Sequence, residues 1–144
     1  MRKVLFATIS FALLLFSCSK ETIYSYRLSG NWIISRIDVK EITNTVSSDY
    51  SLMNAGSYSF KSNNTGSVTT SAGTTVETRA FKWSAQSNKK VLLTFENQSI
   101  EEWIVSRNSS DKQVWESTST SVLNQGGISV GDTLYKKMTL DKIK

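Results

Sequence analysis

Apolar and polar residues alternate in short runs along most of the chain after residue 28. Tyr58 and Phe60 stand two residues apart, as do Val91, Leu93 and Phe95. A period of two places such residues on one face of a β-strand. No window of about 11 residues or more repeats apolar side chains convincingly at helical spacing. The pattern therefore predicts a mostly β protein.

Turn residues separate these runs and set the expected strands. Asn, Gly, Ser and Asp cluster at 63–66, 97–98 and 108–111, and such residues tolerate the backbone angles of tight turns. Seven or eight strands in up-and-down order follow, with no long helical crossover, as in a sandwich or a barrel. The expected strand segments are 30–42, 56–70 (which includes a hairpin turn), 74–86, 89–96, 99–107, 112–118 and 132–143.

Three places interrupt this pattern. Residues 43–55 are ambiguous between a loop and a short helix with Ser48 as its N-cap. Phe81 and Trp83 have the opposite parity from Val76 and Ala80, which predicts a β-bulge between the two sets. We expect a loop around the two glycines at 126–127.

Composition supports the β prediction and limits the class of partner. The chain has no proline and is rich in Ser, Thr, Val, Ile and aromatic residues, which pack well on pleated surfaces. Its formal charge of +5 falls to +3 without Arg2 and Lys3. Its remaining basic residues are scattered, whereas nucleic-acid-binding proteins carry a basic stripe or a known motif. We therefore expect no nucleic-acid partner.

The first residues form a targeting segment. Arg2 and Lys3 precede an uncharged, largely apolar run at 4–16, which is too short to span a bilayer, a task that needs about 20 residues. A positive start and a short apolar core are typical of a secretory signal peptide. The run closes with Leu15-Phe16-Ser17-Cys18, which resembles the lipobox of bacterial lipoproteins.

The lipobox resemblance implies that the signal peptide is cleaved before Cys18, the only cysteine, which then carries acyl chains. The resulting organisation is a signal peptide at 1–17, a lipidated tether at 18–27 and a folded domain at 28–144. Aspartate is missing after Cys18, and the resemblance thus implies an outer-membrane lipoprotein of the bacterial cell envelope. The Lys20-Glu21 pair is similar to the charged tags of surface-exposed lipoproteins.

Most of the domain resembles a second known family. LSGNWIISRI is similar to the Gly-x-Trp signature of lipocalins and of lipocalin-like domains in small bacterial lipoproteins. YSFKSNNTG, FKWSAQ, VLLTF, EEWIVSR and KQVWEST follow in the order of the later strands. The resemblance implies an all-β fold, an antiparallel up-and-down barrel of about eight strands, in which Gly30 and Trp32 plug one end. Lys136, Lys137 and Lys142 stand where typical lipocalins place an arginine over that tryptophan.

An eight-stranded barrel is just wide enough to be filled by side chains or to hold one small ligand. Six aromatic residues could line such a cavity or fill it: Tyr58, Phe60, Trp83, Phe95, Trp103 and Trp115. Both alternatives remain open at the level of sequence.

Candidate chemistry is sparse. The absence of histidine excludes a Ser-His-Asp triad and every His-containing zinc site. Glu101 and Glu102 are adjacent, so on a strand they point to opposite faces and cannot form an acid–base pair. We thus expect no enzyme activity, cofactor or metal site. The sequence favours a membrane-anchored lipoprotein that binds a small apolar ligand or an envelope protein; the alternative is a solidly packed interaction protein with no ligand cavity.

Overall fold

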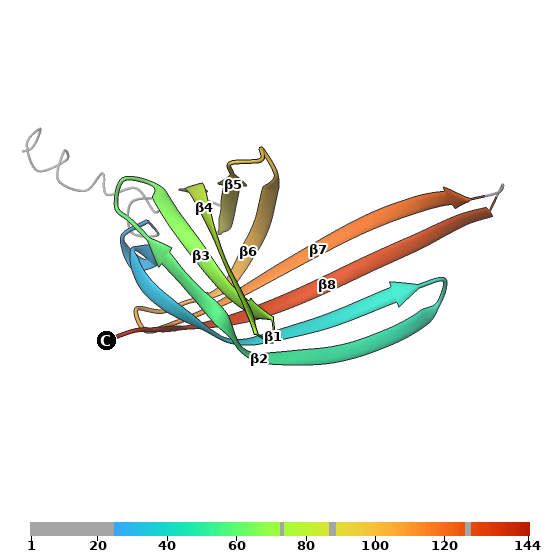
Figure 1. Ribbon diagram of the computed structural model, residues 1–144, viewed down its shortest axis with the longest axis horizontal. Coiled ribbons are helices and arrows are strands. Elements are labelled where there is room, and N and C mark those ends of the chain that lie inside the picture. The colour runs from blue at the N-terminus through green and yellow to red at the C-terminus, as the bar shows by residue number, and fades with distance from the viewer. Residues whose placement is uncertain (1–24, 73, 87–88, 126–127) are drawn as a thin grey trace, which may run out of the picture.

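A closed antiparallel barrel of eight strands forms the protein (Figure 1). The computed structural model describes residues 25–144 apart from 73, 87–88 and 126–127. Each strand pairs with the next along the chain, and β8 returns to pair with β1. The strands are β1 (Gly30–Thr43), β2 (Val46–Phe60), β3 (Thr65–Ala72), β4 (Thr75–Ala85), β5 (Lys90–Phe95), β6 (Ile100–Asn108), β7 (Lys112–Gln125) and β8 (Ile128–Lys142). The predicted fold class, an antiparallel up-and-down barrel, is confirmed.

Alternation of side chains builds the core as the sequence predicts. In β5, Val91, Leu93 and Phe95 are buried, whereas Thr94 between them is exposed. The inward residues of the eight strands meet in one hydrophobic cluster. A helical turn at residues 25–28 adds the fully buried side chain of Leu28 to this cluster.

The predicted turns are present. Asn64 and Gln98 both adopt a φ of 63°, the left-handed conformation that asparagine tolerates better than most residues. The N–H of Lys61 bonds to the carbonyl of Thr65 across the first turn. These short connections fix the register of their hairpins.

The structure corrects three expectations about the strands. Residues 43–55, expected as a loop or short helix, form the β1–β2 turn and most of β2. β7 extends to Gln125 and β8 begins at Ile128, so strand covers residues 119–125 and 128–131, which were expected as part of a loop; the two glycines themselves lie outside the described residues. The bulge expected near Ala80 is absent from the β4 pairing, and register shifts occur instead in β1 near Ile34 and in β6 near Val105.

Two long hairpins project from the barrel (Figure 1). β2 pairs with β3 only at 56–60, and β7 pairs with β6 only at 113–116. Beyond these pairs, β2, β1, β8 and β7 form a four-stranded sheet in that order. We call it the arm sheet: residues 36–43, 46–53, 117–125 and 128–139. Its inner face continues the interior of the barrel.

Among the described residues, no helix is long and apolar enough to cross a membrane.

Candidate ligand-binding mouth

Trp32 closes one end of the barrel. Its ring is 0% exposed, and its Nε1–H donates to the carbonyl of Leu28 over 2.8 Å. The ammonium of Lys142 lies 5.2 Å from the ring centroid and donates to the carbonyl of Ser29 over 3.0 Å. Gly30 has a φ of 124° and lets the Lys142 side chain pass, because a Cβ there would meet its Cε. Of the three lysines that the sequence offered for the position over the tryptophan ring, Lys142 is therefore the one that occupies it.

The six aromatic residues proposed to line or fill a cavity are all buried in the core. Tyr58, Phe60 and Trp115 form a stacked and tilted group with ring centroids 5.5–6.0 Å apart. Trp83 meets Phe60 edge to face at 5.6 Å, which is a favourable aromatic geometry. Ring contacts of this kind occupy the middle of the barrel.

The other two aromatic residues reach the surface. Phe95 borders a depression of about 560 Å³ between β3, β4 and β5. Trp103 borders a depression of about 730 Å³ between β6 and β7, near the end opposite Trp32. We call this second end the mouth.

A charged cluster lies at the mouth on inward-facing positions. Arg79 lies 4.4 Å from the centroid of the Phe95 ring, and its Nη2 is 3.6 Å from a carboxylate oxygen of Glu101. Glu101 also accepts a hydrogen bond of 3.3 Å from the indole N–H of Trp103. Both charged side chains are partly exposed, so the cluster provides polar groups at the rim of an aromatic interior.

The inner face of the arm sheet extends the apolar core into the open. Val39 is buried on β1, and its register neighbour Tyr50 on β2 is 51% exposed. Leu52 pairs with Ile37, which packs against the core, and Leu52 is 49% exposed. Leu134 on β8 adds a partly buried residue to this face and also borders the depression beside Trp103. Apolar side chains therefore continue from the core to open surface at Ile37 and Leu52, and Lys136 lies between Met138 and Leu134 on the same face.

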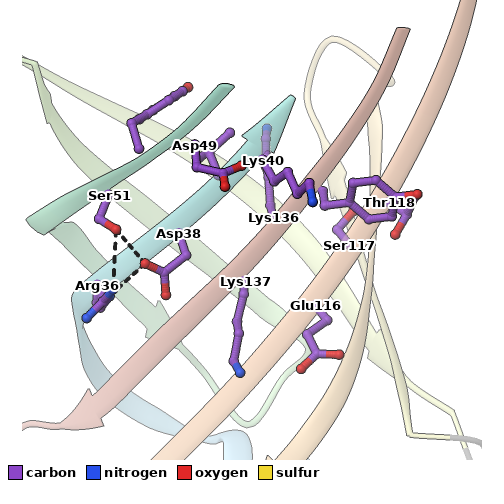
Figure 2. Close-up of a pocket in the computed structure, with 13 residues that line it drawn as sticks. Arg36, Asp38, Lys40, Asp49, Ser51, Glu116, Ser117, Thr118, Lys136 and Lys137 are labelled. Atoms are coloured by element: carbon purple, nitrogen blue, oxygen red, sulfur yellow. Dashed lines mark hydrogen bonds and ion pairs between the residues drawn. The ribbon is translucent and has the colours of Figure 1, made fainter. Parts of the chain in front are cut away.

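A shallow trough crosses the outer face of the arm sheet (Figure 2). It has a volume of about 680 Å³. Three consecutive residues from each of the four strands border it, and the two ends of each triplet share the outer face: 38–40, 49–51, 116–118 and 135–137. Asp38, Lys137 and Glu116 lie on successive strands in one row, so opposite charges neighbour each other across the strands.

Asp38 has the best-defined polar contacts in this trough. Its Oδ1 accepts hydrogen bonds from Ser51 Oγ at 2.6 Å and from Arg36 Nε at 2.7 Å (Figure 2). These bonds, with that from Ser51 as the larger effect, hold the pKa of the carboxyl below its usual value. The trough therefore carries an ordered ion pair rather than a reactive group.

Acidic side chains and the phenol of Tyr58 are the groups of this region that bear on catalytic or metal chemistry. Among the described residues, no three Asp, Glu or Cys side chains gather in a group that could hold a metal ion. Burial and the nearby Glu101 carboxylate raise the pKa of the Tyr58 phenol, so it stays protonated at physiological pH. Glu101 and Glu102 lie on opposite faces of β6, as expected, because Glu101 contacts Arg79 and Glu102 pairs with Lys90.

Sequence reasoning missed Arg79 and the inner face of the arm sheet. Arg79 lies between Thr78 and Ala80 on β4, and its charge gave no sign of an inward-facing position. Tyr50 and Leu52 lie in the segment expected as a loop or helix. Their spacing of two residues, which is typical of one face of a strand, was the signal that could have identified them. Cys18, the predicted lipidation site, lies outside the described residues, as do the predicted signal peptide and most of the tether.

Comparison with known proteins gives limited similarity. No family model and no curated protein matches the sequence. Among solved structures, a deswapped triple mutant of bovine odorant binding protein is similar, with a TM-score of 0.39 and 10% sequence identity. The similarity covers 82% of this chain and 76% of that chain. The strand pairing of the chain itself gives the closed, eight-stranded up-and-down barrel, which is the architecture of lipocalins.

Proposed function

We propose that this protein is a lipoprotein of the bacterial cell envelope that binds a small apolar molecule at the mouth of its barrel, without catalysis. The observation that carries the proposal is the continuation of the apolar core onto the inner face of the arm sheet. There Tyr50 and Leu52 are half exposed beside the buried Val39. Exposed apolar surface that is contiguous with a core and rimmed by polar groups is typical of a binding site.

The surroundings of this face define the class of ligand. An apolar body would lie against Tyr50, Leu52 and Leu134. A polar end would reach the depression beside Trp103, which Lys136 and Glu101 border. Lys136 pairs with Val39 in the β1–β8 register, so it places a positive charge on the inner face between Met138 and Leu134. We infer a ligand with an apolar body and a single polar or anionic head.

Attachment through acylated Cys18 fits this orientation. The helical turn at 25–28 packs Leu28 under Trp32, at the end opposite the mouth. A tether that ends there would turn the mouth away from the outer membrane and toward ligands in solution. Several acyl chains would anchor the protein stably, because each buried CH₂ contributes about 0.8 kcal/mol.

The packed aromatic core favours a second candidate function. Ring contacts between Phe60, Trp83 and Trp115 leave the middle of the barrel occupied by side chains. In that case the exposed inner face of the arm sheet would dock an envelope protein in place of a small molecule. The two candidates share the same surface and differ in what covers it.

Two variants of neighbouring residues separate the candidates. Leu52→Glu places a charge on the inner face, whereas Met53→Glu changes an exposed residue of the outer face as a matched control. Binding of a long-chain fatty acid to the full chain in mild detergent is measured by competition with an environment-sensitive fluorophore. We expect Leu52→Glu to weaken binding about tenfold or more, because it loses the burial of one leucine, and Met53→Glu to leave it unchanged.

Equal effects of the two variants, or no binding to the original protein, would overturn the small-ligand proposal. Anchoring is tested separately in cells fed an alkyne-tagged fatty acid. Label is expected in the original chain and lost in Cys18→Ser. Label that persists in Cys18→Ser would contradict attachment at this residue.

A further inference from the structure

One edge of β7 lacks a strand neighbour within the described part of the chain. β7 pairs with β8 along its whole length but with β6 only up to Glu116. From Ser117 to Gln125 the side of β7 that faced β6 is open, and the hairpin projects away from β6 (Figure 1). The depression of about 730 Å³ between Ser117 and Trp103 separates the first part of this edge from β6.

The hydrogen-bond pattern shows which backbone groups point to this edge. Lys142 N–H donates to the carbonyl of Asp111 over 2.9 Å, so these two residues form a hydrogen-bonded pair. The β7–β8 register then continues without a shift. Alternate residues counted from Asp111 therefore bond to β8, and the residues between them direct N–H and C=O to the open edge. Thr118, Thr120 and Val122 belong to this second set.

The open edge lacks the features that usually prevent strands from pairing with other chains. Residues 117–125 (STSTSVLNQ) contain no charge and no proline, and the β7–β8 register has no bulge. Native proteins commonly protect exposed edges with charges, proline or bulges. The corresponding edge of β2 is different, because it carries Asp49 and is interrupted near Asn54, which has a φ of 51°.

We propose that the open edge of β7 pairs with the same edge of a second copy of this chain, antiparallel and around a two-fold axis at Thr120. This axis places Thr120 opposite the same residue of the second copy and Thr118 opposite Val122. Ser119 meets Ser121 on the other face. All these pairs are uncharged, and threonine and serine pairs across strands are favourable.

Two-fold pairing satisfies the edge from Thr118 to Val122. Hydrogen-bonded pairs at 118, 120 and 122 exchange two bonds each, giving about six backbone bonds between the copies. The two arm sheets join into one continuous sheet, and the interface is self-complementary, as in most dimers. Pairing of β7 with the β2 edge of another copy would not close and would give filaments.

Disulfide cross-linking of the full chain tests this geometry. A hydrogen-bonded antiparallel pair holds its Cα atoms about 5.5 Å apart, within the range of a disulfide. Thr120→Cys is therefore expected to convert most chains to a covalent dimer under mild oxidation. Ser47→Cys on the open edge of β2 is the matched control and is expected to give less than about one tenth as much. The original chain measures any link through Cys18.

Three cross-linking results would overturn the proposal. They are no dimer from Thr120→Cys above the original chain, equal dimer from Ser47→Cys, and a mixed dimer when the two variants are combined. A mixed dimer would indicate β2–β7 pairing between copies.

A proline scan gives an independent measurement. Thr120→Pro removes an N–H that points to the open edge and leaves the β7–β8 bonds in place. Light scattering of the full chain in mild detergent should show dimer dissociation at concentrations about tenfold higher or more than for the original protein. Ser121→Pro breaks a bond to β8 instead and should lower the unfolding midpoint. A monomeric original protein, or an unchanged dimer in Thr120→Pro, would overturn the proposal.

Discussion

Replacing Trp32 with phenylalanine tests the closed end of the barrel. Trp32 is 0% exposed, so the smaller ring loses roughly 45 Å² of buried apolar surface, or about 1 kcal/mol. Loss of the hydrogen bond to the Leu28 carbonyl costs about 1 kcal/mol more, because the buried carbonyl is left without its donor. The cation of Lys142 also loses its preferred indole face, a loss of about 0.5 kcal/mol. We expect the free energy of unfolding to fall by about 2–3 kcal/mol.

Urea unfolding followed by far-UV circular dichroism measures this loss, and Trp103→Phe serves as the matched control. Trp103 is 6% exposed and loses similar area, but its N–H donates to Glu101, whose partly exposed carboxylate can turn to water. We expect a cost of about 1 kcal/mol for the control. Two variants that differ by less than about 0.5 kcal/mol would refute the role assigned to the Leu28 bond.

Three further changes have defined outcomes. Gly56→Ala should lower the free energy of unfolding in urea by about 3 kcal/mol or more, because Gly56 has a φ of 142° and a Cβ there would overlap the Thr69 carbonyl. A loss below about 1 kcal/mol would contradict this steric reasoning. Burial raises the pKa of Tyr58, so its contribution to stability is complete below the unfolded pKa of about 10 and is lost as pH rises further. Tyr58→Phe should remove part of the alkaline decrease in the free energy of unfolding, up to about 1.4 kcal/mol per pH unit, as measured from urea midpoints between pH 9 and 11. Identical pH profiles for the variant and the original protein would contradict this role of Tyr58. Ser51→Ala should raise the pKa of Asp38 toward its usual value, as followed by NMR titration of the carboxyl, and an unchanged pKa would count against the hydrogen bond.

Local pattern predicted most of the barrel because its strands bury one face. The two-residue spacing of Val91, Leu93 and Phe95 is enough to predict β5. Asn64 predicts the turn between β2 and β3, because asparagine tolerates a positive φ. β2 could not be read in this way. Its first part belongs to the arm sheet, where both faces are largely exposed, so pairing with β1 holds a serine-rich segment in the extended conformation.

Inward charges explain the error in β4. The opposite parity of Val76 and Ala80 from Phe81 and Trp83 led to the prediction of a bulge, which the pairing of β4 lacks. In the structure the inward residue is Arg79, whose guanidinium packs on the Phe95 ring and pairs with Glu101. A charge can face inward near the mouth because solvent and a carboxylate are both within reach. This partner lies on β6, far along the chain, and no local pattern records it.

The pairing of β1 with β8 has a consequence for folding kinetics. Ser29 and Lys142, which meet at the closed end, are 113 residues apart in sequence. The seven hairpins between neighbouring strands need only short loops, whereas barrel closure must bring together almost the entire chain. Closure should therefore be the slow, late step of folding. Until it occurs, β1 and β8 each present an unpaired strand edge to neighbouring chains, and refolding yield should fall steeply with protein concentration.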